Sequence, residues 1–201
     1  MDSRSRFCLR WASILILSCL SGCTIVTLDK PLTDEATSVI DKRLIGYWQD
    51  ADTKKNYDGP PPPFVIGRVK DKKNMLELVG AGLDEHKNVS IQRVLLYATS
   101  INDEHYLTAA FTDNGKQFYT LVRYKFVDDD TVRTFLLNTE VLATAIEKHQ
   151  LAGVVVRDEK SADKRLREVR ITAEPAELTK YLKEHGAACF VTEGGVARRV
   201  K

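Results

Sequence analysis

The segment 115–127, GKQFYTLVRYKFV, alternates between two sets of side chains, and this alternation constrains the fold more than any other feature of the sequence. A period of two is typical of a half-buried strand in an antiparallel sheet, because successive side chains of a strand point to opposite faces. The Asn114-Gly115 pair at its start is typical of a tight hairpin. We expect a buried face and an outer face, formed respectively by Phe118, Thr120, Val122, Tyr124 and Phe126 and by Tyr119, Leu121, Arg123 and Lys125.

Further short apolar segments, separated by turn sequences such as DKKN, ND and DDD, extend this pattern over much of the chain. Four consecutive prolines at 60–63 cannot lie inside a sheet, because proline lacks the N–H donor, so we expect an exposed loop over 50–63. Strands are predicted over 44–50, 64–70, 74–82, 88–101, 104–113, 115–127, 131–138, 153–158, 166–172, 188–193 and 196–200.

Three segments have a helical pattern instead. The segment 33–44 predicts a short helix capped by Thr33. The segment 138–153 predicts a helix with an Asn138 or Thr139 cap, and 174–186 predicts a helix with Pro175 in its first turn and Gly186 after its end. The expected buried stripes are Val39, Ile40 and Leu44 in the first, Val141, Leu142, Ala145 and Ile146 in the second, and Leu178, Tyr181 and Leu182 in the third.

Together these elements predict a mainly β fold of the α+β type. We expect an antiparallel sheet that curls into a small barrel or a sandwich, with two or three helices across an opening or a face. Curling removes exposed strand edges, which otherwise promote aggregation. The region 33–201 is long enough to bury a core of its own, so we expect one β-rich domain there.

The first 22 residues have the anatomy of a secretory signal. Arg4, Arg6 and Arg10 form a positive head, and the apolar segment 11–20 follows it. A helix that crosses a bilayer needs about 20 apolar residues, so this segment is too short to span. Small residues come next, as a peptidase requires.

Leu20, Ser21, Gly22 and Cys23 resemble, position by position, the lipobox of bacterial lipoproteins. The resemblance implies cleavage between Gly22 and Cys23 and acylation of the Cys23 thiol and of the new amino group. Several acyl chains hold a protein firmly on a bilayer. In that family an Asp after the cysteine commonly marks inner-membrane retention, so Thr24 favours the periplasmic face of the outer membrane. The alternative is an ordinary cleaved signal with an unmodified cysteine.

We therefore expect a signal peptide over 1–22 and a lipidated tether over 23–32. Cleavage would remove three Arg and one Asp, which leaves 27 basic and 27 acidic residues. A neutral protein has no basic excess to release counterions from a nucleic acid, so nucleic acid is excluded as a partner. The expected partners are membrane lipid, through acylated Cys23, and an envelope protein or polymer.

Gly46-Tyr47-Trp48 resembles the GxW motif on the first strand of lipocalins, which are ligand-carrying β-barrels. Some bacterial lipoproteins are lipocalins. The resemblance implies that Trp48 packs across the closed end of a barrel and that Gly46 lets the strand bend. The alternative for Trp48 is ordinary core packing.

The residues that could do chemistry form no local motif. The histidines lack HExxH spacing, the serines lack GxSxG, and the glycines lack GxGxxG, so we predict no metal, cofactor or catalytic residue. After processing, Cys189 is the one free thiol, and its apolar neighbours predict a small core residue. The candidates considered are His86, His105, His149, His185, Ser38, Ser90, Ser100, Ser161 and Cys189.

The leading hypothesis is a lipid-anchored envelope protein with a non-catalytic binding or assembly role. A lipocalin-like carrier of a small apolar ligand is the alternative. A hydrolase is the third hypothesis, and a metal site or a cleft that brought His105, His149 or Cys189 together would favour it.

Overall fold

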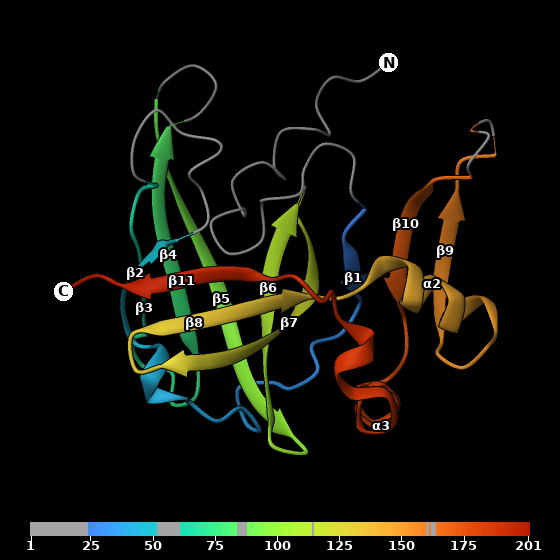
Figure 1. Cartoon of the computed structure of the whole chain (residues 1–201), viewed down its shortest axis with the longest axis horizontal. Helices are drawn as coiled ribbons and strands as arrows, with labels where there is room; N and C mark the ends of the chain where they lie inside the picture. The colour runs from blue at the N-terminus through green and yellow to red at the C-terminus, as the bar shows by residue number, and fades with distance from the viewer. Residues whose placement is uncertain (1–23, 52–60, 84–87, 114, 160, 162–163) are drawn as a thin grey trace.

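Eight strands form a closed antiparallel barrel, so the predicted mainly β fold is confirmed, as a barrel and not a sandwich. The computed structural model describes residues 24–51, 61–83, 88–113, 115–159, 161 and 164–201 (Figure 1). Seven consecutive strands pair as neighbours, and β11 lies between β8 and β2 and closes the barrel. The barrel strands are β2 (Gly46–Asp50), β3 (Phe64–Arg68), β4 (Leu76–Leu83), β5 (Val89–Ile101), β6 (Glu104–Asp113), β7 (Lys116–Asp128), β8 (Thr131–Leu136) and β11 (Gly195–Arg199).

The alternation predicted for the 115–127 segment is confirmed in β7. Val122 lies opposite Leu107 of β6, and the residues of β7 on this face point into the barrel. Leu121, on the other face, is buried outside the barrel against a second layer of structure. The barrel core consists of Leu44, Trp48, Phe64, Ile66, Leu76, Leu78, Val94, Leu96, Ala98, Leu107, Ala109, Val122, Tyr124, Val132 and Ala197.

The second layer lies beside the barrel and has its own hydrophobic core (Figure 1). Most of it is inserted between β8 and β11, and β1 joins it from the start of the chain. In this layer β1 pairs with β10 in parallel, β10 pairs with β9 antiparallel, and Leu28 of β1 lies opposite Tyr119 of β7. Its elements are β1 (Val26–Leu28), α2 (Thr139–Glu147), β9 (Gly153–Arg157), β10 (Leu166–Ile171), α3 (Pro175–His185) and η2 (Gly186–Cys189).

Both α-helices begin where the sequence predicts, and α3 also ends there. The predicted end of α2 near Gly153 is wrong: α2 ends at Glu147, because His149 adopts a φ of 58° just after it and Gly153 begins β9. Asn138 caps α2 by accepting a hydrogen bond from the Val141 backbone N–H at 3.2 Å. Pro175 occupies the first turn of α3, and Gly186 follows its end with a φ of 50°, a conformation that suits glycine. Two predicted burials are wrong. Val39 of the segment 33–44 is 71% exposed, and Val141 is 37% exposed, because the buried face of α2 runs through Leu142, Ala143, Ala145 and Ile146 instead.

The predicted tether over 23–32 is wrong for the part that the structure describes. Val26 and Leu28 are buried in β1, because their strand pairs with Val169 and Ile171 of β10. Leu32 is buried as well, so the folded region begins well before residue 33. Two hydrogen bonds also hold Thr24: its Oγ1 donates to the Leu166 carbonyl at 2.5 Å, and its carbonyl accepts from Thr139 Oγ1 at 3.0 Å.

Two other predicted elements differ. The segment 33–44 forms turns and a short 3-10 helix, η1 (Lys42–Leu44), because Ser38 and Val39 bind the Ala98 carbonyl and hold the chain against β5. The segment 188–193 is not a strand: η2 ends at Cys189, and Phe190 makes a single bridge to Leu137. Both Cys189 and Phe190 turn into the second core instead.

The signal residues 1–22, Cys23, most of the proline-rich loop and His86 lie outside the described residues. Within the described ranges, neither helix has the length and hydrophobicity needed to cross a membrane.

Candidate functional site

Trp48 lies at the end of the barrel where β2 begins. Its ring is fully buried, and its Nε1 donates a hydrogen bond to the Leu44 carbonyl of η1 at 2.8 Å. The ring of Phe126 packs beside it, with 6.3 Å between ring centroids. Since η1 comes directly before β2, this hydrogen bond fixes the short helix against the indole ring.

Arg199, at the end of β11, covers the same ring from the other side. Its guanidinium carbon lies 4.5 Å from the Trp48 ring, a cation–π contact. Nη1 donates to the Ile45 carbonyl at 2.9 Å and Nη2 to the Arg43 carbonyl at 2.6 Å. One side chain therefore joins the last strand, the first barrel strand and the chain that enters it.

Gly46 makes room for this arrangement. Its φ is +149°, where side chains are rarely tolerated, and a Cβ there would lie 2.3 Å from Nη1 of Arg199. The glycine is needed for the close approach of the guanidinium as well as for its own backbone conformation.

A second set of contacts closes the same end. The Tyr124 hydroxyl donates to Asp41 Oδ2 at 3.1 Å, and Arg43 donates to both oxygens of Asp41 at 3.0 and 2.8 Å. Arg43 also lies over the Phe126 ring at 4.4 Å. We call the set Asp41, Arg43, Leu44, Trp48, Tyr124, Phe126 and Arg199 the closed end.

Hydrogen bonds stabilise the negative charge of the Asp41 carboxylate at the closed end. Partial burial opposes ionisation of Asp41, but the hydrogen bonds and charge of Arg43 and the Tyr124 hydroxyl outweigh it and lower the pKa of that carboxyl. Burial, followed by the nearby Asp41 charge, raises the pKa of the Tyr124 hydroxyl. Tyr124 is therefore a neutral donor, and Asp41 an ionised acceptor, at physiological pH.

In the opposite half of the barrel, small residues of β4 and β5 occupy inward positions. Gly80 of β4 lies between Phe64 and Gln92, on the face that points inward. By strand alternation Gly82 and Ser90 follow on the same face. Phe111 and Phe118, opposite each other on β6 and β7, stack with 5.5 Å between centroids. We call the end that holds the β2–β3, β4–β5 and β6–β7 connections the distal end.

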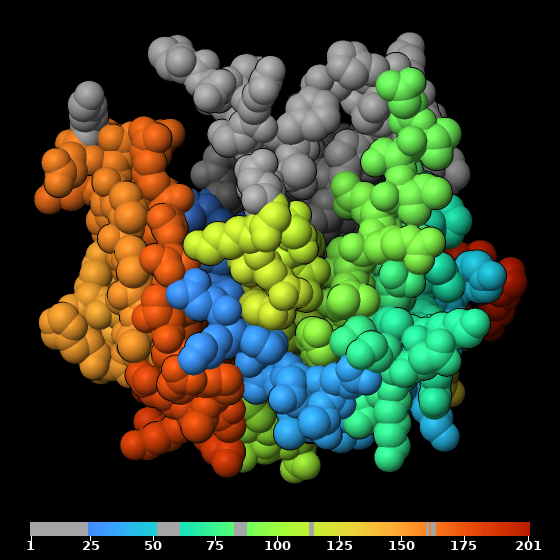
Figure 2. Space-filling model, turned by 180° about the vertical axis from the view of Figure 1, so that it is seen from behind, coloured from blue at the N-terminus to red at the C-terminus, as the bar shows by residue number. Residues whose placement is uncertain are grey.

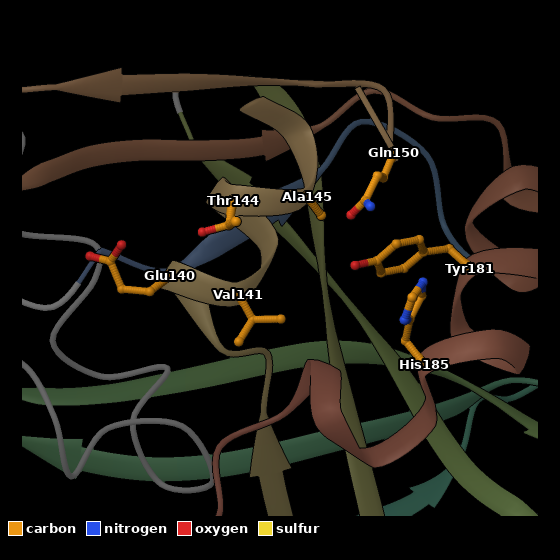
Figure 3. Close-up of a pocket in the computed structure, with 7 residues that line it drawn as sticks. All are labelled: Glu140, Val141, Thr144, Ala145, Gln150, Tyr181 and His185. Atoms are coloured by element: carbon orange, nitrogen blue, oxygen red, sulfur yellow. The ribbon is translucent and has the colours of Figure 1, made fainter. Parts of the chain in front are cut away.

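A hollow of about 360 Å³ lies outside the barrel between α2 and α3 (Figure 3). The Tyr181 and His185 rings stand on its α3 side, 4.2 Å apart. Burial raises the pKa of the Tyr181 hydroxyl. The exposed Val141 lies on its α2 side, which explains why this residue is not in the core. The lining residues are Glu140, Val141, Thr144, Ala145, Gln150, Tyr181 and His185.

The residues that sequence analysis considered for chemistry are spread over the molecule. His105 Nδ1 and Ser100 Oγ share a 2.8 Å hydrogen bond, which follows from their direct pairing across β5 and β6. His149 adopts a φ of 58° just after α2, and His185 faces the hollow. No cluster of potential metal ligands occurs among the residues that the structure describes.

Cys189 is fully buried in the second core, as predicted for a small core residue. Burial raises the pKa of its thiol to about 11, so the reactive thiolate is disfavoured at neutral pH.

Sequence analysis missed Arg199 and the hollow. A signal for Arg199 is present, because alternation along β11 places it on the same face as Ala197, and a charged residue on a core-facing position calls for a partner. For the hollow, no comparable sequence signal exists, since it depends on how α2 and α3 are spaced. In comparisons with known proteins, no family model, curated protein or solved structure matches this chain.

Proposed function

We propose that the protein is a lipid-anchored component of a bacterial cell envelope whose barrel has a binding role and no catalytic one. The observation that supports this most is the barrel itself, an eight-stranded closed sheet with one end sealed around Trp48. Rigid barrels of this size hold a packed core or one small ligand. The anchor is Cys23, on the side of the outer membrane that faces the periplasm.

The sequence around Cys23 and the start of the fold support the anchor together. The arginine head, the short apolar segment and Leu20-Ser21-Gly22-Cys23 agree with a lipoprotein signal. Thr24 is already hydrogen-bonded to the second layer, so the folded domain begins immediately after the cleavage point.

The arrangement of nucleophiles supports a binding role over hydrolysis. The Cys189 thiol is buried, with a raised pKa and away from solvent. Ser100 and His105 pair at the β5–β6 turn as cross-strand neighbours, and Ser100 is exposed. A nucleophile needs a base and donors for the developing oxyanion around one substrate position.

A carrier of a small apolar ligand is the second candidate, and the sealed Trp48 end favours it. The GxW resemblance implies a tryptophan across the closed end, and Trp48 has that place. Gly80 occupies an inward position toward the distal end and has no side chain to fill the barrel there. Binding would then occur in the distal half of the barrel.

The test of the carrier role is a titration with an apolar fluorescent fatty acid. Gly80→Leu fills the barrel interior and should abolish the fluorescence increase. Gly67→Leu is the matched control, because Gly67 lies on the outer face of β3 and a Cβ there meets no atom within 4 Å. Circular dichroism shows that both variants fold. Equal binding by Gly80→Leu, or none by the wild type, rejects the carrier.

The anchor is tested separately, by incorporation of radiolabelled palmitate and by fractionation of the envelope. A labelled protein in the outer-membrane fraction supports the proposal. A soluble, unlabelled protein that retains residues 1–22 rejects it, whatever the barrel binds.

A further inference from the structure

The chain leaves the described structure at the distal end. The arrows of β4, β6 and β9 point toward the same end of the molecule, the top of Figure 1. Since β10 is antiparallel to β9 and β1 is parallel to β10, β1 starts at that end. The described chain therefore begins, at Thr24, on the side of the β4–β5, β6–β7 and β9–β10 connections.

Few residues separate Cys23 from β1, the first strand of the fold. Only Thr24 and Ile25 lie between Cys23 and β1, and two extended residues reach about 7 Å. Thr24 is held on both sides by the hydrogen bonds to Leu166 and Thr139, which shortens the reach further. Any group attached to Cys23 is thus confined to the distal end.

Two apolar side chains stand exposed at this end. Val89 is 75% exposed and Ile91 is 63% exposed, on the outer face at the start of β5. Ala81 of β4, opposite Ile91, is exposed beside them. In Figure 2 the start of β5 and the β9–β10 region project as two separate prominences at this end. The closed end also exposes Tyr47, Val127 and Val200, so the entry of the chain at the distal end, and not exposure alone, distinguishes Val89 and Ile91.

A lipid bilayer fits these features as the occupant. We propose that the domain stands end-on against the membrane that holds its anchor, with Val89 and Ile91 inserted at the boundary between the headgroups and the acyl chains. This inference depends on the proposed acylation of Cys23. The exposed Lys116, at the β6–β7 connection of the same end, can extend its ammonium group to lipid phosphates. The closed end with Trp48 then faces away from the bilayer.

The test places an environment-sensitive fluorophore on single cysteines in the acylated, full-length processed protein. Val89→Cys and Ile91→Cys report on the proposed contact. Val127→Cys is the control: this residue is 61% exposed, almost as much as Ile91, but lies beside the β7–β8 connection at the other end. Cys189 is buried and Cys23 is blocked by acylation, so neither takes the label.

The proteins are reconstituted into vesicles of phosphatidylethanolamine and phosphatidylglycerol that contain brominated acyl chains. We expect bromine to quench labels at 89 and 91, at a depth of about 5–10 Å below the headgroup boundary, and not the label at 127. Protein that floats with the vesicles but shows equal quenching at all three positions overturns the end-on contact and leaves the anchor intact. If the protein does not float with the vesicles, the proposed anchor is wrong, and the end-on contact that depends on it is wrong as well.

Discussion

The guanidinium carbon of Arg199 lies 4.5 Å from the centre of the Trp48 ring, while the same group donates hydrogen bonds to the carbonyls of Ile45 and Arg43. This contact joins the last barrel strand to the first. Arg199→Ala removes a cation–π contact and leaves two carbonyls without their charged donor, so we expect a loss of about 2–3 kcal/mol in the free energy of unfolding. Urea denaturation of the wild type and of Arg199→Ala measures this loss.

The neighbouring Arg198→Ala is the control for that experiment. Arg198 is exposed on the outer face of the same strand, so its removal should change stability by less than about 0.5 kcal/mol. Equal losses for the two variants would show that the Trp48 contact contributes nothing of its own.

Gly46→Ala should destabilise the protein in two ways. A side chain at a φ of +149° costs about 1–3 kcal/mol in backbone strain, and the new Cβ also collides with Nη1 of Arg199. The collision disappears in the double variant with Arg199→Ala. We therefore expect the two losses to be non-additive, with a coupling of about 1 kcal/mol or more in a double-mutant cycle. Strict additivity would contradict the steric explanation.

Asp41 should make stability depend on pH in the acid range. Its pKa is lowered in the folded state, so the unfolded chain binds the proton more readily. The stabilisation is fully present above the ordinary aspartate pKa and is lost as the pH falls through the lower pKa of the folded state. The stability difference between the wild type and Asp41→Asn should then be largest at neutral pH and shrink on acidification.

Urea midpoints at a series of pH values measure this dependence. Glu193→Gln, which also replaces an acidic side chain by its amide but at an exposed position, controls for the change in net charge. A difference between the wild type and Asp41→Asn that stays constant with pH would exclude the proposed role of the carboxylate.

The Cys189 thiol should resist modification in the native protein. It is fully buried, and burial raises its pKa to about 11. Ellman's reagent should react with it only after unfolding. Because the folded state holds the thiol proton more tightly, stability should fall as the pH rises from the ordinary thiol pKa, about 8.5, toward 11. Cys189→Ala should weaken this alkaline fall, and rapid native modification would refute the burial.

If Cys23 is acylated as proposed, Cys23→Ser should abolish acylation and leave an unprocessed precursor, because the lipobox resemblance implies that the thiol of this residue carries the lipid. Metabolic labelling with palmitate, followed by electrophoresis, detects both effects. Cys189→Ser is the matched control and should be labelled and processed like the wild type. Normal labelling of Cys23→Ser would refute the anchor.

Local pattern predicted much of the barrel. The alternation of apolar and polar residues along β7 predicted its two faces, because the face to which a strand residue points depends only on its position relative to its immediate neighbours. Asn138, Pro175 and Gly186 marked helix ends for a similar reason, because capping depends on a few adjacent backbone groups.

Pairing between distant segments could not be predicted in this way. β1 has three residues, and it is a strand because Val169 pairs with it from the other end of the chain. The GxW resemblance singled out Trp48, but its partner Arg199 becomes visible only when β11 is known to lie beside β2. Val141 was misplaced because the position of α3 decides which face of α2 is covered.

The place of β11 has a consequence for biosynthesis. The strand that completes the ring of hydrogen bonds is the last one made, after the whole second layer. When the ribosome has synthesised seven of the eight barrel strands, β11 is still missing. Until it is made, β2 and β8 each keep one unpaired edge. Termination of translation between β8 and β11 would therefore leave a chain with two unsatisfied strand edges, which proteases and chaperones would recognise as unfolded.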